Sequence, residues 1–366
     1  MNMGKVPSGM VQTVLGAVNP SALGITLTHE HLIIDLTEVL PHMSTVPGVS
    51  KVADIYHETL SQENVGLVRY HFAPNEDNYL ISDVENAIIE ANYYKDFGGG
   101  TLVDVTIPDI GRNPSALATI SRKTGLNIVM GSGHYVDVAH PKEMNAKTEE
   151  DIEAKIVSDL TYGLDAVTDS GEYDGPDRIK AGIIGEIGCS WPLTDNERKV
   201  LRAAGRAQSI TGFPLLIHPG RDETAPLEIL DVLDEVGTDL YHTIIGHLDR
   251  TVFKKDTLMA IAKAGVYMEW DLFGREQHYY NGNVDIDMPN DAKRIADIAW
   301  IMDQGYQDKI VVAHDICTKD RLFKYGGHGY FYLLSQIIPR MKYKGYSKGQ
   351  IDSLFVENPA KALTIK

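Results

Sequence analysis

The chain has 366 residues, 43% of them hydrophobic, and a formal net charge of −17. This charge repels phosphate backbones and argues against a nucleic-acid-binding protein. No run approaches the roughly 18 uninterrupted apolar residues that a membrane helix needs, and the polar N-terminus lacks the apolar core of a signal peptide. We therefore expect a cytoplasmic protein with a large core and neither a nucleic-acid nor a membrane partner.

The first part of the chain predicts a short hairpin, a strand and a long connection. Residues 11–20 predict the hairpin, which would close the bottom of the fold, and residues 24–31 form an apolar run typical of a strand. The connection over 36–83 holds several aromatic residues and three histidines. Connections of this length usually carry function or local structure, so we expect this one to form a partial lid.

Helical patterns alternate with strand-type runs through the rest of the chain. Residues 84–91 carry apolar side chains at the i, i+3, i+4 and i+7 spacing of an amphipathic helix. A second long connection covers 134–180 and is rich in polar residues and glycine near its end. Residues 194–211 predict a further helix, which begins with the capping-box pair Thr194 and Glu197.

Eight apolar, β-branched runs along the chain predict strands. Their order with intervening helices is typical of βα units that form a parallel sheet. The expected strands are 24–31, 100–107, 127–133, 182–188, 214–218, 243–247, 266–270 and 310–314. We interpret the pattern as an α/β fold, a (β/α)8 TIM barrel formed by 1–366 as a single domain, with its active site and long loops at the C-terminal strand ends.

The two cysteines, Cys189 and Cys317, follow the fourth and eighth expected strands. The ends of these strands face each other across an eight-stranded barrel, so a disulfide is not expected. We interpret both residues as reduced thiols, as is usual in a cytosolic protein.

Side chains that commonly bind metals end or follow five of the expected strands. Because residues i and i+2 of a strand point to the same side, His29 and His31 should both enter the barrel mouth. The complete set, here called the six predicted ligands, is His29, His31, Glu186, His218, His247 and Asp315. A single histidine is more often a packing or surface residue, and we assign that role to His42, His57, His71, His140 and His242.

The number and type of ligands fit two divalent metal ions. His29, His31 and Asp315 would hold one ion, His218 and His247 the other, and Glu186 would bridge both together with a hydroxide. Imidazole and carboxylate ligands suit Zn, Mn, Co or Fe and do not distinguish among them.

Such a centre predicts hydrolysis at a carbonyl or phosphoryl group. Metal binding lowers the pKa of water from about 15.7 towards 7, which makes hydroxide available as a nucleophile near neutral pH. Asp315 would accept the proton of the attacking hydroxide and return it to the leaving group. The alternative from another class is a binding protein without turnover, but that reading predicts a missing ligand or proton acceptor, and both are present.

Several motifs resemble the phosphotriesterase family of the amidohydrolase superfamily. They span nearly the whole chain: Thr26–His31 (TLTHEH), Val103–Arg112, Ile245–Asp249, Val312–Cys317 and Glu357–Lys361. Within this family, Gly185–Leu193 and Ile217–Arg221 are most similar to the phosphotriesterase-related branch of animals. The resemblance implies a TIM-barrel hydrolase with two metal ions, most often Zn.

The resemblance also carries an expectation about the substrate. Organophosphate-hydrolysing and lactonase members of the family bridge their metals with a carboxylated lysine, where this chain has Glu186. Lys180 precedes the expected strand and would lie at its opposite end, so phosphotriesterase activity should be negligible. The animal branch implies hydrolysis of N-acetyltaurine to taurine and acetate, and the alternative is a lactonase or carboxylesterase.

Three arginines follow the strands that are expected to line the site. Arg221, Arg250 and Arg275 are candidates to bind the tail of a small anionic N-acyl amino acid, because a planar guanidinium suits paired recognition of oxyanions. An arginine taken alone more often forms a surface salt bridge, but we expect at least one of the three to reach the substrate.

Further candidate residues for substrate binding lie in the loops. Tyr135, which matches a family position, or its neighbour His134 could orient the hydroxide or the carbonyl oxygen, and His328 and Tyr330 could line the pocket. The sequence leaves the oligomeric state open, with a homodimer as one option.

Overall fold

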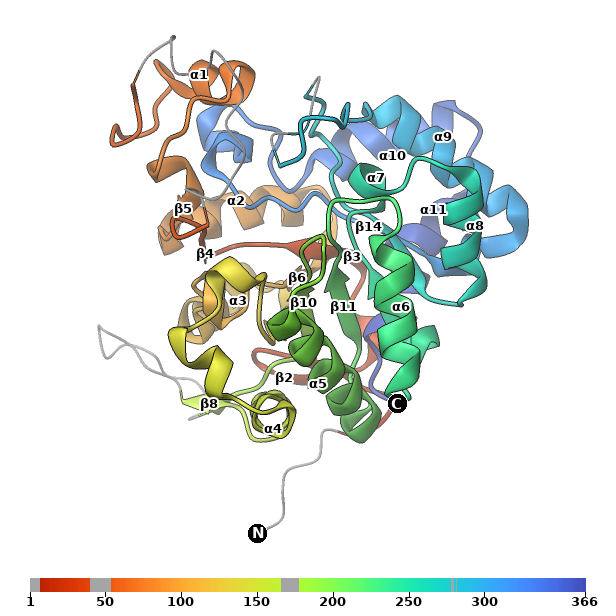
Figure 1. The fold of residues 1–366 in the computed structure, drawn as a ribbon. Helices are drawn as coiled ribbons and strands as arrows, with labels where there is room; N and C mark the ends of the chain where they lie inside the picture. Colours follow the sequence, from red (N-terminus) through yellow and green to blue (C-terminus); the bar gives the residue numbers. More distant parts are fainter. Residues whose placement is uncertain (1–6, 40–53, 166–177, 278–279, 281) are drawn as a thin grey trace.

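The computed structural model describes residues 7–39, 54–165, 178–277, 280 and 282–366. A parallel sheet of eight strands forms its centre, and helices surround the sheet (Figure 1). The spatial order is β14-β13-β12-β11-β10-β7-β6-β3, so the two ends of the sheet are the last and the first strand of the barrel. These strands are β3 (Ile25–Glu30), β6 (Gly99–Asp104), β7 (Asn127–Ser132), β10 (Ile183–Gly188), β11 (Leu215–His218), β12 (Thr243–Ile245), β13 (Tyr267–Trp270) and β14 (Ile310–Val312). The predicted (β/α)8 barrel is therefore confirmed, with a sheet that is nearly closed.

Three strands end two or three residues earlier than the apolar runs suggested. The predicted ends were residues 107, 247 and 314, whereas β6, β12 and β14 end at Asp104, Ile245 and Val312. In each case the first N–H group after the strand still donates to a carbonyl of a neighbouring strand, and the second donates to a carboxylate. Thr106, His247 and His314 donate to Asp104, Asp271 and Glu30, respectively.

The helices follow the strands in the alternating order that the sequence predicts. The helix expected from residue 84 is α2, and the one expected over 194–211 is α5, with Thr194 and Glu197 forming the capping box. The described helices are α1 (Val65–His71), α2 (Val84–Asp96), α3 (Pro114–Thr124), α4 (Glu149–Thr161), α5 (Asp195–Thr211), α6 (Ala225–Glu235), α7 (Leu248–Thr251), α8 (Lys255–Lys263), α9 (Asp291–Ile301), α10 (Ile338–Tyr343), α11 (Lys348–Asp352) and α12 (Asn358–Leu363).

The N-terminal hairpin closes one end of the barrel, as expected. β1 (Val11–Thr13) pairs with β2 (Gly16–Val18) in antiparallel register. Val14 donates to the carbonyl of Ile128 in β7. Val11 packs with Leu23, Val103 and further apolar residues of the sheet in a cluster separate from the main core. The loops lie at the opposite end of the barrel, where the strands terminate.

The first long connection has a small core of its own. β4 (Ile34–Asp35) pairs with β5 (Leu80–Ile81), and α1 packs on apolar residues of 55–73. Arg69 of α1 donates to carbonyls in the loop after β14, among them that of Gly326 at 3.1 Å. Residues 40–53, which belong to the expected lid, lie outside the described residues.

The second long connection contains α4 and a short antiparallel pair. β8 (Leu164–Asp165) pairs with β9 (Arg178–Ile179), and residues 166–177 between these strands lie outside the described residues. Cys189 and Cys317 are both free thiols, as predicted. Within the described ranges, no helix has the length and apolar character needed to cross a bilayer.

The seam between the first and last strands is closed by one carboxylate. Glu30, at the end of β3, accepts the backbone N–H groups of His314 at 2.8 Å and Ile316 at 3.1 Å. It also accepts Nδ1–H of His314 at 2.7 Å. The Nε2 atom of His314 accepts the N–H of Leu333, which fixes this tautomer. One backbone hydrogen bond, from Asp315 to the carbonyl of His29, completes the seam.

Replacing Glu30 with Gln should destabilise the fold because the neutral amide keeps only one acceptor oxygen for three buried donors, so at least one donor would face an NH2 group. We expect the free energy of unfolding to fall by about 2–3 kcal/mol. Urea denaturation followed by circular dichroism measures this change. The exposed Glu63→Gln variant is the matched control, and an equal small effect for both variants would contradict the role of Glu30.

Candidate metal centre

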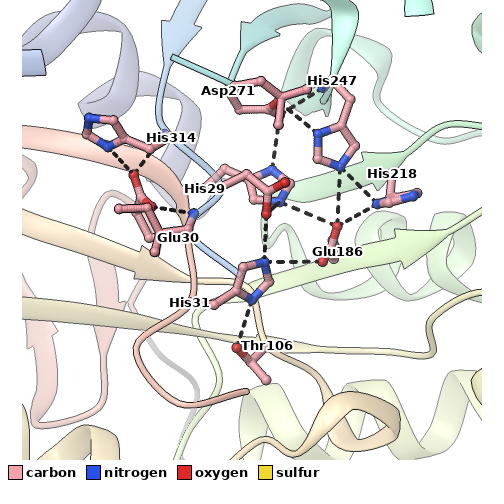
Figure 2. Close-up of polar contacts among 12 residues, drawn as sticks. His29, Glu30, His31, Thr106, Glu186, His218, His247, Asp271 and His314 are labelled. Atoms are coloured by element: carbon pink, nitrogen blue, oxygen red, sulfur yellow. Dashed lines mark hydrogen bonds and ion pairs between the residues drawn. The ribbon is translucent and has the colours of Figure 1, made fainter. Parts of the chain in front are cut away.

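Four histidine side chains aim one nitrogen each at a common space near the strand ends. His29 and His31 come from β3 and the residue that follows it, and His218 and His247 from the ends of β11 and β12. His247 Nε2 and His218 Nδ1 are 2.9 Å apart. All four imidazoles are almost completely buried. Figure 2 shows that they converge on Glu186.

The two carboxylate oxygens of Glu186 face different parts of this space. Oε1 is 3.5 Å from His31 Nε2, whereas Oε2 is 2.9 Å from His218 Nδ1, 3.4 Å from His29 Nε2 and 3.6 Å from His247 Nε2. Burial alone would raise the pKa of Glu186, but His29, His218 and His247 lower it well below its ordinary value. The carboxylate is therefore ionised, with one oxygen near His31 and the other near the remaining three histidines.

Asp315 completes the set from the loop after β14. Its Oδ1 is 3.2 Å from His31 Nε2 and 3.9 Å from His29 Nε2. Its side chain is 12% exposed, whereas those of His29 and Glu186 are 0% and 3% exposed. Asp315 is thus the more accessible acid of the set.

The backbone takes the left-handed conformation at two of these residues, with φ of 54° at His247 and 53° at Asp315. Non-glycine residues rarely adopt this conformation, which costs roughly 1–2 kcal/mol per residue. It turns the chain sharply after β12 and β14, and the side chains then point back over the strand ends.

Carboxylates and a hydroxyl hold the far nitrogens of three histidines. Asp271 accepts from His247 Nδ1 at 2.8 Å and lies 3.2 Å from His29 Nδ1. Glu269 is 3.1 Å from the same nitrogen of His29. His31 Nδ1 lies 2.9 Å from the hydroxyl of Thr106. A proton on each outer nitrogen leaves the inner nitrogen with a free lone pair, which is the tautomer that a metal requires.

The donor atoms fit a bound metal ion. His29 Nε2 is buried and has no hydrogen-bond partner among the described residues, as expected for an atom that binds a ligand. The inner atoms of His29, His31 and Asp315 all lie within 4.8 Å of one another, and so do those of His29, Glu186 and His247. Imidazole nitrogens with carboxylate oxygens form a set suited to Zn and neighbouring transition metals.

The electrostatics of the centre also favour a cation. Burial alone would lower the pKa of His29, but Asp271 and Glu186 raise it well above its ordinary value. Asp271 likewise outweighs burial at His247, where the pKa rises to about 9. At His218, by contrast, burial and the neighbouring His247 lower the pKa to about 3. The carboxylates thus hold positive charge at a place that a metal ion can take.

The structure separates the two candidates after β7. The hydroxyl of Tyr135 lies 3.4 Å from His218 Nδ1, at the centre. Burial, followed by the charge of Glu186, raises the pKa of Tyr135 well above its ordinary value, so this hydroxyl keeps its proton and can donate. His134 turns to Asp109 instead, with Nδ1 3.0 Å from both carboxylate oxygens.

The three predicted arginines gather on one side of the centre. Arg250 is fully buried, and its Nη2 lies 3.1 Å from His218 Nε2 and 3.2 Å from the carbonyl oxygen of Pro219. Arg221 and Arg275 are half-buried. We call Arg221, Arg250 and Arg275 the arginine cluster, because their guanidinium groups surround one aromatic ring, that of Tyr280.

The other predicted loop residues have supporting positions. His328 stacks on His314, with ring centroids 5.4 Å apart, and its Nε2 accepts from Arg321 at 3.3 Å. The hydroxyl of Tyr330 donates to the carbonyl oxygen of His31 at 2.6 Å. Neither contact reaches an inner donor atom. Of the five histidines that were assigned packing or surface roles, His57 and His71 are exposed, His140 and His242 are partly or fully buried, and His42 lies outside the described residues.

Sequence reasoning missed four residues that shape the centre: Glu269, Asp271, Tyr280 and Arg321. The first two are acids two residues apart at the end of β13, the same spacing that identified His29 and His31. Arg321 donates to the carbonyl oxygens of Asp315 and His314 and so fixes the loop after β14. No motif marks Arg321 or Tyr280, because Tyr280 contacts arginines in other segments and Arg321 donates to backbone carbonyls, which every residue carries.

Comparison with known proteins agrees with this geometry. The model of the phosphotriesterase family matches residues 9–363. The phosphotriesterase-related protein of Nematostella vectensis is 43% identical over 98% of this chain and 99% of its own length. The N-acetyltaurine hydrolase of Bos taurus is also 43% identical, with the same coverage. A crystal structure of a resiniferatoxin-binding protein from Rhodobacter sphaeroides has a TM-score of 0.88 and 32% identity, covering 98% of this chain and 96% of that one.

Replacing Asp271 with Asn should weaken metal binding, because a neutral amide with one acceptor oxygen replaces the two carboxylate oxygens that lie 2.8 Å from His247 Nδ1 and 3.2 Å from His29 Nδ1. Losses of such outer partners typically reduce metal affinity by about 10- to 100-fold. Titration with Zn²⁺ against a competing chelator measures the affinity. Asp256→Asn on the exposed face of α8 is the control. Wild-type affinity in Asp271→Asn would contradict the assigned role.

Proposed function

Because this chain belongs to the phosphotriesterase family of hydrolases, we propose that it is a metal-dependent amidohydrolase that cleaves a small anionic N-acyl amino acid. N-acetyltaurine, with taurine and acetate as products, is the first candidate substrate, because relatives with this activity in their names are about two-fifths identical over nearly the whole chain. Two divalent ions, Zn or else Mn, Co or Fe, would be its cofactors.

The observation that carries the proposal is the arginine cluster beside the six predicted ligands. Arg250 Nη2 lies 3.1 Å from His218 Nε2. An anionic group bound to the arginine cluster would therefore lie close to the carbonyl group that reacts. Among the described residues no carboxylate lies within ion-pair distance of Arg221 or Arg250. A buried charge without a counter-charge is costly, and the anionic tail of a substrate would supply that counter-charge.

The six predicted ligands would hold the two ions. His29, His31 and Asp315 would hold one ion, His218 and His247 the other, and Glu186 would contribute to both, with Oε1 nearest His31 and Oε2 nearest His218 and His29. When bound, the metal supplies an activated water near neutral pH and polarises the carbonyl group of the substrate.

Asp315 is the proposed proton carrier. Burial alone would raise the pKa of Asp315, but the hydrogen bond from His31 and the charges of His247 and His29 lower it below its ordinary value. The carboxylate is therefore ionised and can take the proton of the attacking water at an Oδ atom. It would then give this proton to the amide nitrogen, because an unprotonated amine is a poor leaving group.

Tyr135 is proposed to donate a hydrogen bond to the carbonyl oxygen as negative charge develops on it. The hydroxyl lies beside His218 and keeps its proton, so it can act as a fixed donor in a buried place. The acyl group would lie between Tyr135 and Asp315, and the tail would point to the arginine cluster.

Asp315→Asn should reduce kcat for N-acetyltaurine by about 10²- to 10⁴-fold, the usual contribution of general acid–base catalysis. Release of taurine by the metal-loaded enzyme measures the rate, and metal content is determined for the same sample. Asp303→Asn on the exposed surface is the control. A variant that keeps its metal and full activity would exclude Asp315 as the proton carrier.

A substrate panel should separate the amidohydrolase from its alternatives. We expect kcat/KM to be highest for N-acetyltaurine, at least about tenfold lower for the neutral N-acetylpropylamine, which lacks the anion that the arginines would bind, and negligible for phosphotriesters. Simple lactones and carboxylic esters belong in the same panel. A lactone turned over with a higher kcat/KM than every N-acyl substrate would replace the proposed function by the lactonase alternative.

A further inference from the structure

Tyr280 lies at the centre of the arginine cluster. The guanidinium carbons of Arg221, Arg250 and Arg275 are 5.5, 5.6 and 4.9 Å from the centroid of its ring. In addition, Arg221 Nε donates to the Tyr280 hydroxyl at 3.2 Å. The three arginines follow the consecutive strands β11, β12 and β13. Tyr280 is therefore a single residue that contacts the segments after all three strands.

The loop that carries Tyr280 is tied to Arg221 by its backbone. Tyr280 donates to the carbonyl oxygen of Ile286 at 2.8 Å, and Asn283 donates to that of Tyr280 at 3.0 Å. The side-chain amide of Asn283 then donates to the carbonyl oxygen of Arg221 at 3.0 Å. A Cβ atom at Gly282 would lie 2.6 Å from Arg221 Nε, so only glycine permits this approach.

Tyr280 also compensates part of the charge of the cluster. The face of an aromatic ring attracts guanidinium groups, and its hydroxyl oxygen accepts a hydrogen bond from one of them. A neutral ring cannot balance the charges of Arg221 and Arg250, for which the described residues offer no carboxylate within ion-pair distance. These two arginines therefore keep positive charge that one small anion could balance.

We propose that Tyr280 determines the specificity of this site by holding the arginine cluster as one convergent set that accepts a compact anionic group of the substrate. The proposal rests on the proposed function for the position of the reacting bond. Guanidinium groups that approach from three loops suit an anion with three oxygens, such as a sulfonate, better than a planar carboxylate, which offers two.

The charge on Tyr280 gives this role a distinctive pH dependence. Burial alone would raise the pKa of the Tyr280 phenol, but Arg221, Arg250 and Arg275 lower it to about 7. The arginines stay protonated in this range. The other members of its packing cluster, Leu272, Ile286 and Met288, are apolar. Above this pKa the phenolate competes with the substrate anion for the arginines, so the anion should bind more weakly as the pH rises.

Tyr280→Phe tests the proposal because it removes the hydroxyl and keeps the ring. With metal-loaded enzyme at pH 6.5, we expect KM for N-acetyltaurine to rise about three- to tenfold with kcat within about twofold, as for loss of one hydrogen bond to a charged group. KM for the neutral N-acetylpropylamine should not change. At pH 8.5 the ratio of KM between variant and wild type should fall towards one, because only the wild type forms a phenolate.

Tyr241→Phe, on an exposed tyrosine, is the matched control. Equal losses for the anionic and neutral substrates, or a loss in kcat alone, would mean that Tyr280 only supports the fold and would overturn the proposal. A KM ratio that stays constant between pH 6.5 and 8.5 would overturn it as well.

Direct binding of ethanesulfonate separates this proposal from the proposed function. Isothermal titration calorimetry at pH 6.5 should show binding to the wild type, weaker binding to Tyr280→Phe and to Arg221→Gln, and weaker binding of propionate than of ethanesulfonate to the wild type. This result would support the role of Tyr280 even if no N-acyl substrate were hydrolysed. Equal affinity in the wild type and Tyr280→Phe, or no binding by the wild type, would refute it.

Discussion

The carboxylate of Glu30 joins the two ends of the sheet, and the position of the centre depends on it. Glu30 lies between His29 and His31 in the sequence. Its carboxylate oxygens accept the backbone N–H groups of His314 and Ile316, the residues on both sides of Asp315. A barrel of this kind could close its seam by a ladder of backbone hydrogen bonds. Here the buried side chain of Glu30 forms most of the hydrogen bonds that close the seam. The contact that completes the barrel therefore also brings His29, His31 and Asp315 together.

Charge is distributed unevenly around the centre. The loops after β3 and β14 contribute Asp315 and histidines, whereas those after β11, β12 and β13 contribute the arginine cluster. In a chain of net charge −17, this local excess of positive charge is confined to one side of the site. An anionic substrate would therefore be oriented before any bond changes, because only one end of it is attracted to the arginines.

The strands and the convergence of the six predicted ligands could be predicted because both follow from local pattern. Apolar runs identify buried strands, and a histidine at the end of such a run has few directions in which to point. The supporting residues could not be predicted in this way. Glu269 and Thr28 meet across 241 positions of the chain, and Arg221 and Tyr280 across 59. The sequence also could not decide between His134 and Tyr135. Asp109 binds the His134 ring and the backbone N–H of Tyr135, and this leaves the Tyr135 side chain to point to the centre.

Glu186 and the arginine cluster lie in different parts of the site. The residues proposed to bind the metal can therefore be separate from those proposed to select the substrate. In the proposed function, Glu186 would provide a bridging carboxylate without covalent modification, because its two oxygens lie near different histidines. This part of the site would act on the reacting carbonyl group. The leaving group would instead meet the segments after β11, β12 and β13, where Tyr280 contacts the three arginines. Changes in these three loops could alter the substrate without disturbing the seam at Glu30, since the two sets of contacts share no residue.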